Sequence, residues 1–339
     1  MNTHSLLSRR HFLLGTGSIG LASVLPLGAT SSRAGSLKVG MLIPGHIDDG
    51  GFMEAGYKGL QKIENELGAG TEYIDQIEWK LEALSNALRK LAAQKPNLII
   101  AHGGNNNDAV KAVAPDFPDI QFVVVQGNVT GDNISSYEVL QEQSAWLGGA
   151  LAGLMTKTGT VGHISGVPVP PGLKGRAAFA NGLKHTKPDA KFLTVFCGAQ
   201  DDVELAAKAA EAEIQAGADI IFTMLNAGRV GAIDKCRAHK VLQIGNVRDW
   251  YPTAPDVFVA SAISNAGLAG FRAAADVAAG KFAPGNKVHI GLEMAEAVSL
   301  AMAPNVSDNV RSHIENLANR IVRKEIVVST EWSGEEIKI

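Results

Sequence analysis

Polar and aromatic side chains gather in loops that follow the apolar runs of this 339-residue chain. The first such loop, "GHIDDGGFMEAG", holds Asp48, Asp49, Phe52 and Met53. A ring in so glycine-rich and acidic a loop either folds back onto its own helix or stacks on a flat ligand. Stacking of that kind adds ~0.5–1.5 kcal/mol beyond area burial. One of the two aspartates is expected to cap the helix that begins near Phe52.

A second polar loop, "HGGNNND", follows the run "LII" and concentrates hydrogen-bond donors and acceptors at one place. One of these residues can cap the next helix. A single cap does not need four such side chains. We therefore predict that Asn106 and Asp108 contact a ligand.

Loops of the second half carry a similar set of groups. In "FCGAQDD", Gln200 is expected to reach the site, and Asp201 is expected to cap a helix with Glu204 completing the capping box. In "NAGRVG", Asn226 is a candidate donor, and Gly228 permits close approach of the backbone.

Two further loop positions complete the predicted site. Arg229 is the alternative donor to Asn226, and "GNVRDWY" places Asp249 and Trp250 directly after an apolar run. Asp249 is expected to accept hydrogen bonds from a ligand. Trp250 is either a second stacking surface or a lid against a helix.

The residue types favour binding over catalysis. The chain has no G-x-S-x-G, H-E-x-x-H or phosphate-loop motif, and its nine histidines form no pair with metal-ligand spacing. No metal and no cofactor is predicted. Acids alone can catalyse, so an enzyme is the alternative from another class.

The elements that must position these loops occur twice along the chain. The strand "LKVGMLIPG" and the helix 52–68 are repeated by "GTVGHISGV" and the helix 173–188. The apolar run "PNLIIAHGG" follows the first strand by roughly 60 residues, and "ADIIFTMLN" follows "GTVGHISGV" by a similar distance. Continuous apolar strands that alternate with helices indicate parallel sheets buried on both faces. The sequence therefore predicts an α/β fold of two doubly wound parallel-sheet lobes, with a ligand cleft at the carboxyl ends of the strands.

The lobes are expected to exchange segments through a hinge of several strands. The first lobe is predicted to contain 36–158 plus 264–288. The second is predicted to contain 159–263 plus 289–339. Crossings are expected near 157–159, 262–264 and 287–290.

The amino-terminal segment reads as an export signal. Residues 1–35 combine the pair Arg9 and Arg10 with an apolar run and small residues, which is typical of a twin-arginine signal cleaved after Ala34. This predicts a periplasmic protein. No cysteine follows the apolar run, so a lipoprotein is not expected. The net charge of -3 gives no basic surface for nucleic acid, and a monomer is expected.

The two cysteines, Cys197 and Cys236, both lie well inside the chain. An oxidising compartment permits a disulfide between them. Because each cysteine sits beside an apolar stretch, two buried free thiols are the favoured interpretation.

Several stretches together resemble the basic-membrane-protein (BMP/Med) family. They are "KVGMLIPGHIDDGGFMEAGYKGL", "LIIAHGGNNNDAVKAVAPDFPDIQFVVV", "AWLGGALAGLMTKTGTVGHISG", "GAQDDVELAAKAAEAEIQAGADIIF" and "GKFAPGNKVHIGL". The resemblance covers nearly all of 37–325. It implies a type I periplasmic-binding fold, an ABC permease as partner, and a purine nucleoside or related small molecule as ligand.

The family pattern maps onto several of the loop residues. Phe52 matches the family's stacking ring, while Met53 stands where an asparagine is usual. Asp108 and Asp249 match family aspartates. The chain departs at Gln200, which replaces a second stacking ring, and at Ser264, which replaces a lysine thought to hold ribose hydroxyls.

These departures leave several ligand classes open. The ligand could be a nucleobase, another heterocycle or a sugar instead of a nucleoside. Trp250 is a candidate to replace the missing second stacking ring. The enzyme alternative is then an exported hydrolase of nucleosides. A sensor that signals to a receptor is a further alternative to transport.

Overall fold

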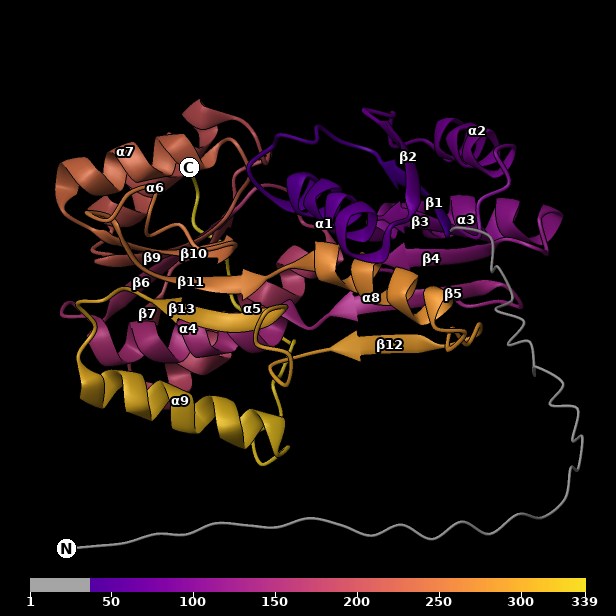
Figure 1. Cartoon of the computed structure of the whole chain (residues 1–339). Coiled ribbons are helices and arrows are strands. Elements are labelled where there is room, and N and C mark those ends of the chain that lie inside the picture. The colour runs from indigo at the N-terminus through magenta and orange to yellow at the C-terminus, as the bar shows by residue number, and fades with distance from the viewer. Residues whose placement is uncertain (1–36) are drawn as a thin grey trace, which may run out of the picture. The chain divides into compact units, whose positions relative to one another are not determined.

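The structure is a computed structural model that describes residues 37–339 (Figure 1). The predicted export signal, residues 1–35, lies outside the described residues. Two β-sheets organise the described chain. We call them sheet 1 and sheet 2, and we call each sheet with its covering helices a lobe.

Sheet 1 has six strands, and every pair of neighbours in it is parallel. In spatial order they are β12 (Lys287–Ile290), β5 (Ile134–Val139), β4 (Gln121–Val125), β3 (Leu98–His102), β1 (Lys38–Ile43) and β2 (Gly70–Asp75).

Sheet 2 is built from seven strands. Its spatial order is β13 (Val298–Met302), β11 (Phe258–Ser264), β10 (Leu242–Val247), β9 (Ile220–Met224), β6 (Thr160–Ser165) and β7 (Lys191–Phe192), with β8 (Val195–Phe196) also paired to β6. β13 runs antiparallel to β11, and the other pairs are parallel.

Both sheets place their strands in one order. With β7 and β8, which both pair with β6, counted as one strand, the order along the chain within each lobe is second, first, third, fourth, fifth, followed by one late strand. Such a sheet is doubly wound, and its switch point lies beside the first strand. The predicted α/β fold of two doubly wound lobes is therefore confirmed.

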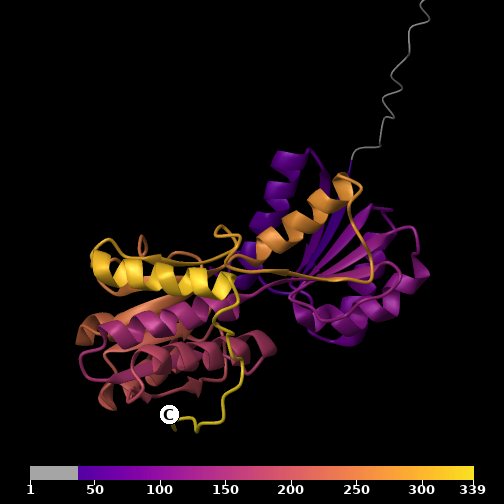
Figure 2. The same cartoon turned by 90° about the horizontal axis from the view of Figure 1, so that it is seen from below.

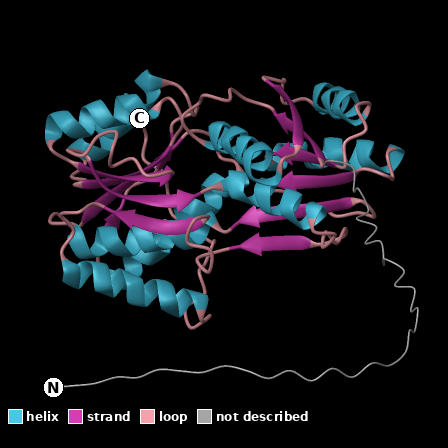
Figure 3. Ribbon diagram, viewed as in Figure 1, coloured by secondary structure: helices cyan, strands magenta, loops and turns pink. Residues whose placement is uncertain are grey.

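Helices cover both faces of each sheet (Figures 2 and 3). Sheet 1 carries α1 (Phe52–Leu67), α2 (Leu81–Ala92), α3 (Asn107–Val113) and α8 (Ala266–Ala278). Sheet 2 carries α4 (Gln141–Met155), α5 (Pro170–Thr186), α6 (Val203–Gln215), α7 (Arg229–His239) and α9 (Asp308–Val322). Short 3₁₀ turns span Gly104–Asn106 and Ala114–Asp116.

Apolar strands such as β9 are buried because both of their faces meet helices. Ile220 and Phe222 pack in the cluster of α4 and α5, whereas Ile221 packs in the cluster of α6 and α7. Each buried side chain of this size contributes about 1.5–3 kcal/mol. Strand residues alternate between faces, so an unbroken apolar run is the pattern that such a strand requires.

The chain crosses between the lobes three times (Figure 2). The crossings lie between β5 and α4, between β11 and α8, and between β12 and β13. The first crossing was expected near 157–159, but it lies near residue 140, because α4 packs in the core of the second lobe. Eleven of the fifteen residues of α4 are buried, among them every residue from Ser144 to Gly153, so the middle of the helix shows no polar face from which its lobe could be inferred.

Glycines bring α4 and α5 into backbone contact. A Cβ placed on Gly149 would overlap the Phe179 carbonyl oxygen, and one on Gly182 would overlap the Trp146 carbonyl oxygen. By contrast, a Cβ on the adjacent Gly148 would lie 3.4 Å from Ile244 Cγ2, which is ordinary contact. Close helix packing therefore depends on particular glycines of α4 and not on its glycine content in general.

The structure bears on the two cysteines and on membrane-spanning helices. Cys197 and Cys236 are both free and buried. Within residues 37–339, no helix has the combined length and apolar character needed to cross a membrane.

The contact between α4 and α5 generates a matched pair of substitutions. Gly149→Ala should lower the free energy of unfolding by about 1–3 kcal/mol, because the new methyl group overlaps a backbone oxygen. Gly148→Ala should leave stability unchanged or raise it by up to ~1 kcal/mol through helix propensity. Urea unfolding followed by circular dichroism measures both. Equal effects of the two variants would refute backbone contact as the reason for Gly149.

Candidate functional site

Loops at the carboxyl ends of strands from both sheets meet each other. The loop after β1 contacts the loop after β9, where Asn226 Nδ2 donates to Asp49 Oδ2 at 3.0 Å. The same β1 loop also meets the loop after β10, since Arg248 Nε lies 3.5 Å from the Gly50 carbonyl oxygen. These contacts join the lobes at the edge where doubly wound sheets bind ligands.

Asp49 holds the start of α1. Its Oδ1 accepts from the Gly51 N–H at 2.7 Å and from the Glu54 N–H at 3.1 Å, and its Oδ2 accepts from the Met53 N–H at 3.2 Å. The side chain is buried, and burial raises the pKa of its carboxyl against the opposing effect of these backbone donors. The expected capping role therefore falls to Asp49, while Asp48 is exposed.

Gly51 allows the two loops to touch. A Cβ at this position would overlap Asn226 Oδ1, so any side chain here would force the loops apart. The hydrogen bond from Asn226 to Asp49 and the missing side chain of Gly51 thus act at one contact between the lobes.

Phe52 is half-buried and stacks on His102, with ring centroids 4.2 Å apart and an interplanar angle of 26°. His102 Nε2 lies 2.8 Å from the Phe52 carbonyl oxygen. A carbonyl only accepts, so Nε2 carries the hydrogen. Burial lowers the pKa of His102 to about 4, and the imidazole is neutral at pH 7. The ring of Phe52 is thus backed by a neutral, fully buried imidazole.

The two predicted residues of the "HGGNNND" loop lie in different environments. Asn106 is fully buried, and its Nδ2 donates to the carbonyl oxygens of His102 and Gly103, both at 3.0 Å. This amide shapes the loop. Asp108 is exposed in the first turn of α3.

Gln200, Asn226 and Gly228 come together through the backbone. The Gln200 carbonyl oxygen accepts from the N–H groups of Asn226 and Gly228, at 3.1 and 3.2 Å. Gly228 is buried, and a Cβ there would lie 2.9 Å from that same oxygen. At Gly228 it is therefore the backbone of the Gln200 loop that approaches closely.

The expected cap of α6 is shifted by one residue. Asp202 is the N-cap and accepts from the Leu205 N–H at 2.9 Å. Asp201 instead accepts from the Ala227 N–H at 3.1 Å, and so joins the two loops of the second lobe. Because α6 begins at Val203, the carboxylate immediately before it has the geometry of a cap.

Trp250 is a buried scaffold residue. Its Nε1 donates to the Asn246 carbonyl oxygen at 2.8 Å, and its ring lies under the guanidinium groups of Arg229 and Arg248, at 4.3 and 3.7 Å from the centroid. Asp249 is exposed, and its Oδ1 accepts from the Tyr251 N–H at 3.0 Å.

Two further predicted site residues, Met53 and Ser264, are also buried. Met53 packs in the core of the first lobe against Gly45. Ser264 lies at the end of β11 and is 4% exposed, whereas the next residue, Asn265, lines the cavity between the lobes.

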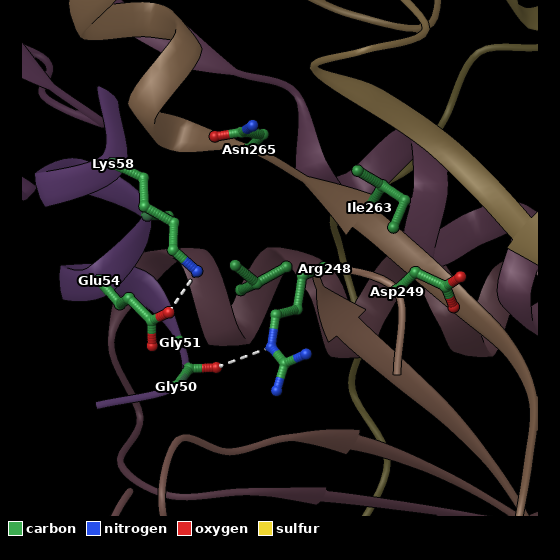
Figure 4. Close-up of a pocket in the computed structure, with 10 residues that line it drawn as sticks. Gly50, Gly51, Glu54, Lys58, Arg248, Asp249, Ile263 and Asn265 are labelled. Atoms are coloured by element: carbon green, nitrogen blue, oxygen red, sulfur yellow. Dashed lines mark hydrogen bonds and ion pairs between the residues drawn. The ribbon is translucent and has the colours of Figure 1, made fainter. Parts of the chain in front are cut away.

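A cavity of about 260 Å³ lies at this meeting of loops (Figure 4). It is lined by Gly50, Gly51, Glu54, Ala55, Lys58, Val247, Arg248, Asp249, Ile263 and Asn265. Of the twelve predicted site residues, only Asp249 is among them. The first two turns of α1 and the end of β10 therefore contribute groups that the sequence interpretation missed.

The backbone at the end of β10 is strained. The Arg248 N–H donates to the Asn246 carbonyl oxygen at 2.9 Å, which closes a three-residue turn around Val247. Val247 has φ 71°, a conformation that a β-branched residue rarely adopts. Strained residues of this kind cluster at ligand sites, and this one lines the cavity.

The described groups suit ligand binding. No cluster of three or more His, Cys, Asp or Glu residues with metal-binding geometry occurs within residues 37–339. The lining instead combines an ion pair of Glu54 and Lys58, the guanidinium of Arg248 and the amide of Asn265 with apolar surface. Pockets with a few polar groups in an apolar wall fix the orientation of small molecules.

Comparison with known proteins places the chain among binding proteins. A family model described as "ABC transporter substrate-binding protein PnrA-like" matches residues 36–331. A transcriptional activator protein, med, of Bacillus subtilis is 28% identical over 238 residues, which cover 70% of this chain and 74% of that protein.

Two other similarities cover more of the chain. A purine-binding protein of Brucella abortus is 26% identical over 303 residues, 88% of this chain and 85% of that protein. The solved structure of an ABC transporter solute-binding protein from Aeropyrum pernix has a TM-score of 0.75 at 19% identity, and covers 88% of this chain and 94% of that one. At this identity the structural likeness concerns the fold alone.

The contact between Gly51 and Asn226 can be tested by suppression. Gly51→Ala should keep the lobes apart, because the methyl group overlaps Asn226 Oδ1. The double variant Gly51→Ala/Asn226→Ala removes that oxygen and should restore the approach. Small-angle X-ray scattering compares the radius of gyration of both variants with that of the wild type. A double variant that stays as extended as the single one would contradict this account.

His102 should remain neutral over the physiological range. Its folded-state pKa of about 4 lies below the unfolded value of 6.5, so the neutral ring contributes stability above pH ~6.5 that is lost as pH falls towards 4. NMR of labelled imidazoles, assigned with a His102→Gln variant, should show the Nε2–H form from about pH 8 to about pH 5. A titration midpoint near 6.5 would contradict the buried, stacked geometry.

Proposed function

The chain belongs to the PnrA-like ABC transporter substrate-binding proteins, and we propose that it binds a purine nucleoside or nucleobase in the cleft between its lobes. The observation that carries this proposal is the meeting of both sheets' carboxyl-end loops around a small cavity. The name of the purine-binding relative in Brucella abortus supports the ligand class.

Phe52 is the stacking surface in this proposal. Phe52 is partly buried at the start of α1, and its ring stacks on the buried ring of His102. A heterocycle on such a ring gains dispersion and quadrupole energy. Asp108, exposed at the start of α3, and Asp249, at the cavity wall, then accept hydrogen bonds from the polar edges of the ligand.

The lobes close on the ligand by a hinge motion at the three crossings, as in other two-lobed binders. The contact of Asp49 with Asn226 stabilises the closed arrangement. The protein works as a monomer in the periplasm, exported by its twin-arginine signal, and delivers the closed form to an ABC permease.

A ligand screen tests the proposal. The full chain is unfolded, dialysed and refolded to remove carried ligand, and its melting temperature is then measured with nucleosides, nucleobases and monosaccharides. A purine compound at about 100 times its Kd should stabilise the protein by ~2.7 kcal/mol, which raises the melting temperature. Monosaccharides should have no effect.

Two controls sharpen the result. Phe52→Ala should lose most of the ligand-induced shift, whereas Phe282→Ala, a partly buried ring beyond the end of α8, should keep it. Chromatography of the incubated ligand checks for turnover. A shift with sugars alone, or release of free base from nucleosides, would overturn the proposed function.

A further inference from the structure

The cavity is lined by two cations, Lys58 and Arg248, and by two anions, Glu54 and Asp249, which the protein pairs to different degrees. Lys58 and Glu54 form an ion pair on successive turns of α1 (Figure 4). The carboxylate of Asp249 accepts from the Tyr251 N–H. Arg248 faces the cavity with no carboxylate oxygen within 4.0 Å among residues 37–339. Its side-chain hydrogen bonds, to the Gly50 carbonyl and to Thr253 Oγ1, are both 3.5 Å long. The N–H groups of the Arg248 guanidinium therefore form only long hydrogen bonds within the protein and are available to a ligand.

The guanidinium of Arg248 is held in place. It lies 3.7 Å from the ring centroid of Trp250. The ring Nε1–H of Trp250 donates to the Asn246 carbonyl oxygen, and the backbone N–H of Trp250 donates to Ser261 Oγ at 2.9 Å. Stacking on an aromatic ring orients the planar fork and leaves its edge free for hydrogen bonds. Arg248 thus presents a preorganised pair of donors.

Arg229 adds a second positive charge behind the same wall. It is 1% exposed and lies over Trp250, and its terminal nitrogens donate to neutral acceptors only: the carbonyls of Thr223 and Leu225, the Thr223 hydroxyl and the Asn246 amide oxygen. Burial, together with the charge of Arg248, lowers the pKa of Arg229 to about 9. This wall of the cavity therefore favours an electron-rich edge of a ligand.

The chemistry of the fork narrows the ligand class. A guanidinium binds two adjacent, coplanar acceptors with two parallel hydrogen bonds. A 6-oxopurine presents such a pair in O6 and N7, whereas a 6-aminopurine presents N7 beside an amino donor. An amino group that faces the guanidinium would place two hydrogen-bond donors opposite each other, and no hydrogen bond could form between them.

We propose that Arg248 is the specificity-determining residue of this site and that the ligand is a 6-oxopurine or its nucleoside, bound through O6 and N7. This inference rests on the proposed function and names its substrate class. It does not depend on Phe52, because the cavity that holds Arg248 is lined by other residues.

Isothermal titration calorimetry of the stripped protein with hypoxanthine and adenine tests the inference. The wild type should prefer hypoxanthine by at least about 10-fold. Arg248→Gln should weaken hypoxanthine binding by about 10- to 100-fold and leave adenine within about threefold of its wild-type affinity. Arg248→Lys keeps the positive charge but loses the paired donors, so its affinity for hypoxanthine should lie between those of the wild type and Arg248→Gln. Arg272→Gln, on the outer part of α8, is the matched control and should change neither affinity.

The outcomes separate the two proposals. Equal binding of adenine and hypoxanthine, or an unchanged preference in a folded Arg248→Gln variant, overturns the role of Arg248 while purine binding stands. Binding of no purine by the wild type overturns the proposed function. In that case a thermal shift with benzoate that is lost in Arg248→Gln would support Arg248 as a reader of paired acceptors, and its absence would overturn that role as well.

Discussion

The buried carboxylate of Asp49 accepts hydrogen bonds from three backbone N–H groups at the start of α1 and from Asn226 of the second lobe. An unpaired carboxylate in this position would cost several kcal/mol, so the loop conformation and the contact between the lobes stabilise each other. Gly51 completes the constraint by leaving room for Asn226. The placement of Phe52 and Glu54 relative to the second sheet follows from this one group.

The frame around that contact is rigid for a different reason. Doubly wound sheets buried on both faces hold the loops at their carboxyl ends, and the glycines of α4 and α5 let the two helices pack backbone against backbone. A frame of this kind can support the strained turn at Val247, which directs the following residue, Arg248, to the cavity.

Electrostatics of the site depends on residues that are distant in the sequence. The guanidinium groups of Arg229 and Arg248 both lie over the ring of Trp250. Among the described residues, neither guanidinium has a carboxylate oxygen within 4.0 Å. Glu54 is already paired with Lys58. The guanidinium of Arg248 is therefore a cavity group whose hydrogen bonds within the protein are long, at 3.5 Å.

The sequence by itself determined the fold, because apolar runs, helical periodicity and their repetition along the chain are local properties that doubly wound sheets require. It also indicated the loops that meet at the cleft, and an aspartate of the first loop as a helix cap. Tertiary structure alone decided that α4 belongs to the second lobe, since a helix buried all round shows no polar face. It decided that Asp202 and not Asp201 caps α6, because capping depends on where the helix begins. It also decided that Arg248 lines the cavity while the ring of Trp250 is covered, because the direction of a loop side chain depends on backbone dihedrals and on contacts between segments far apart in the chain.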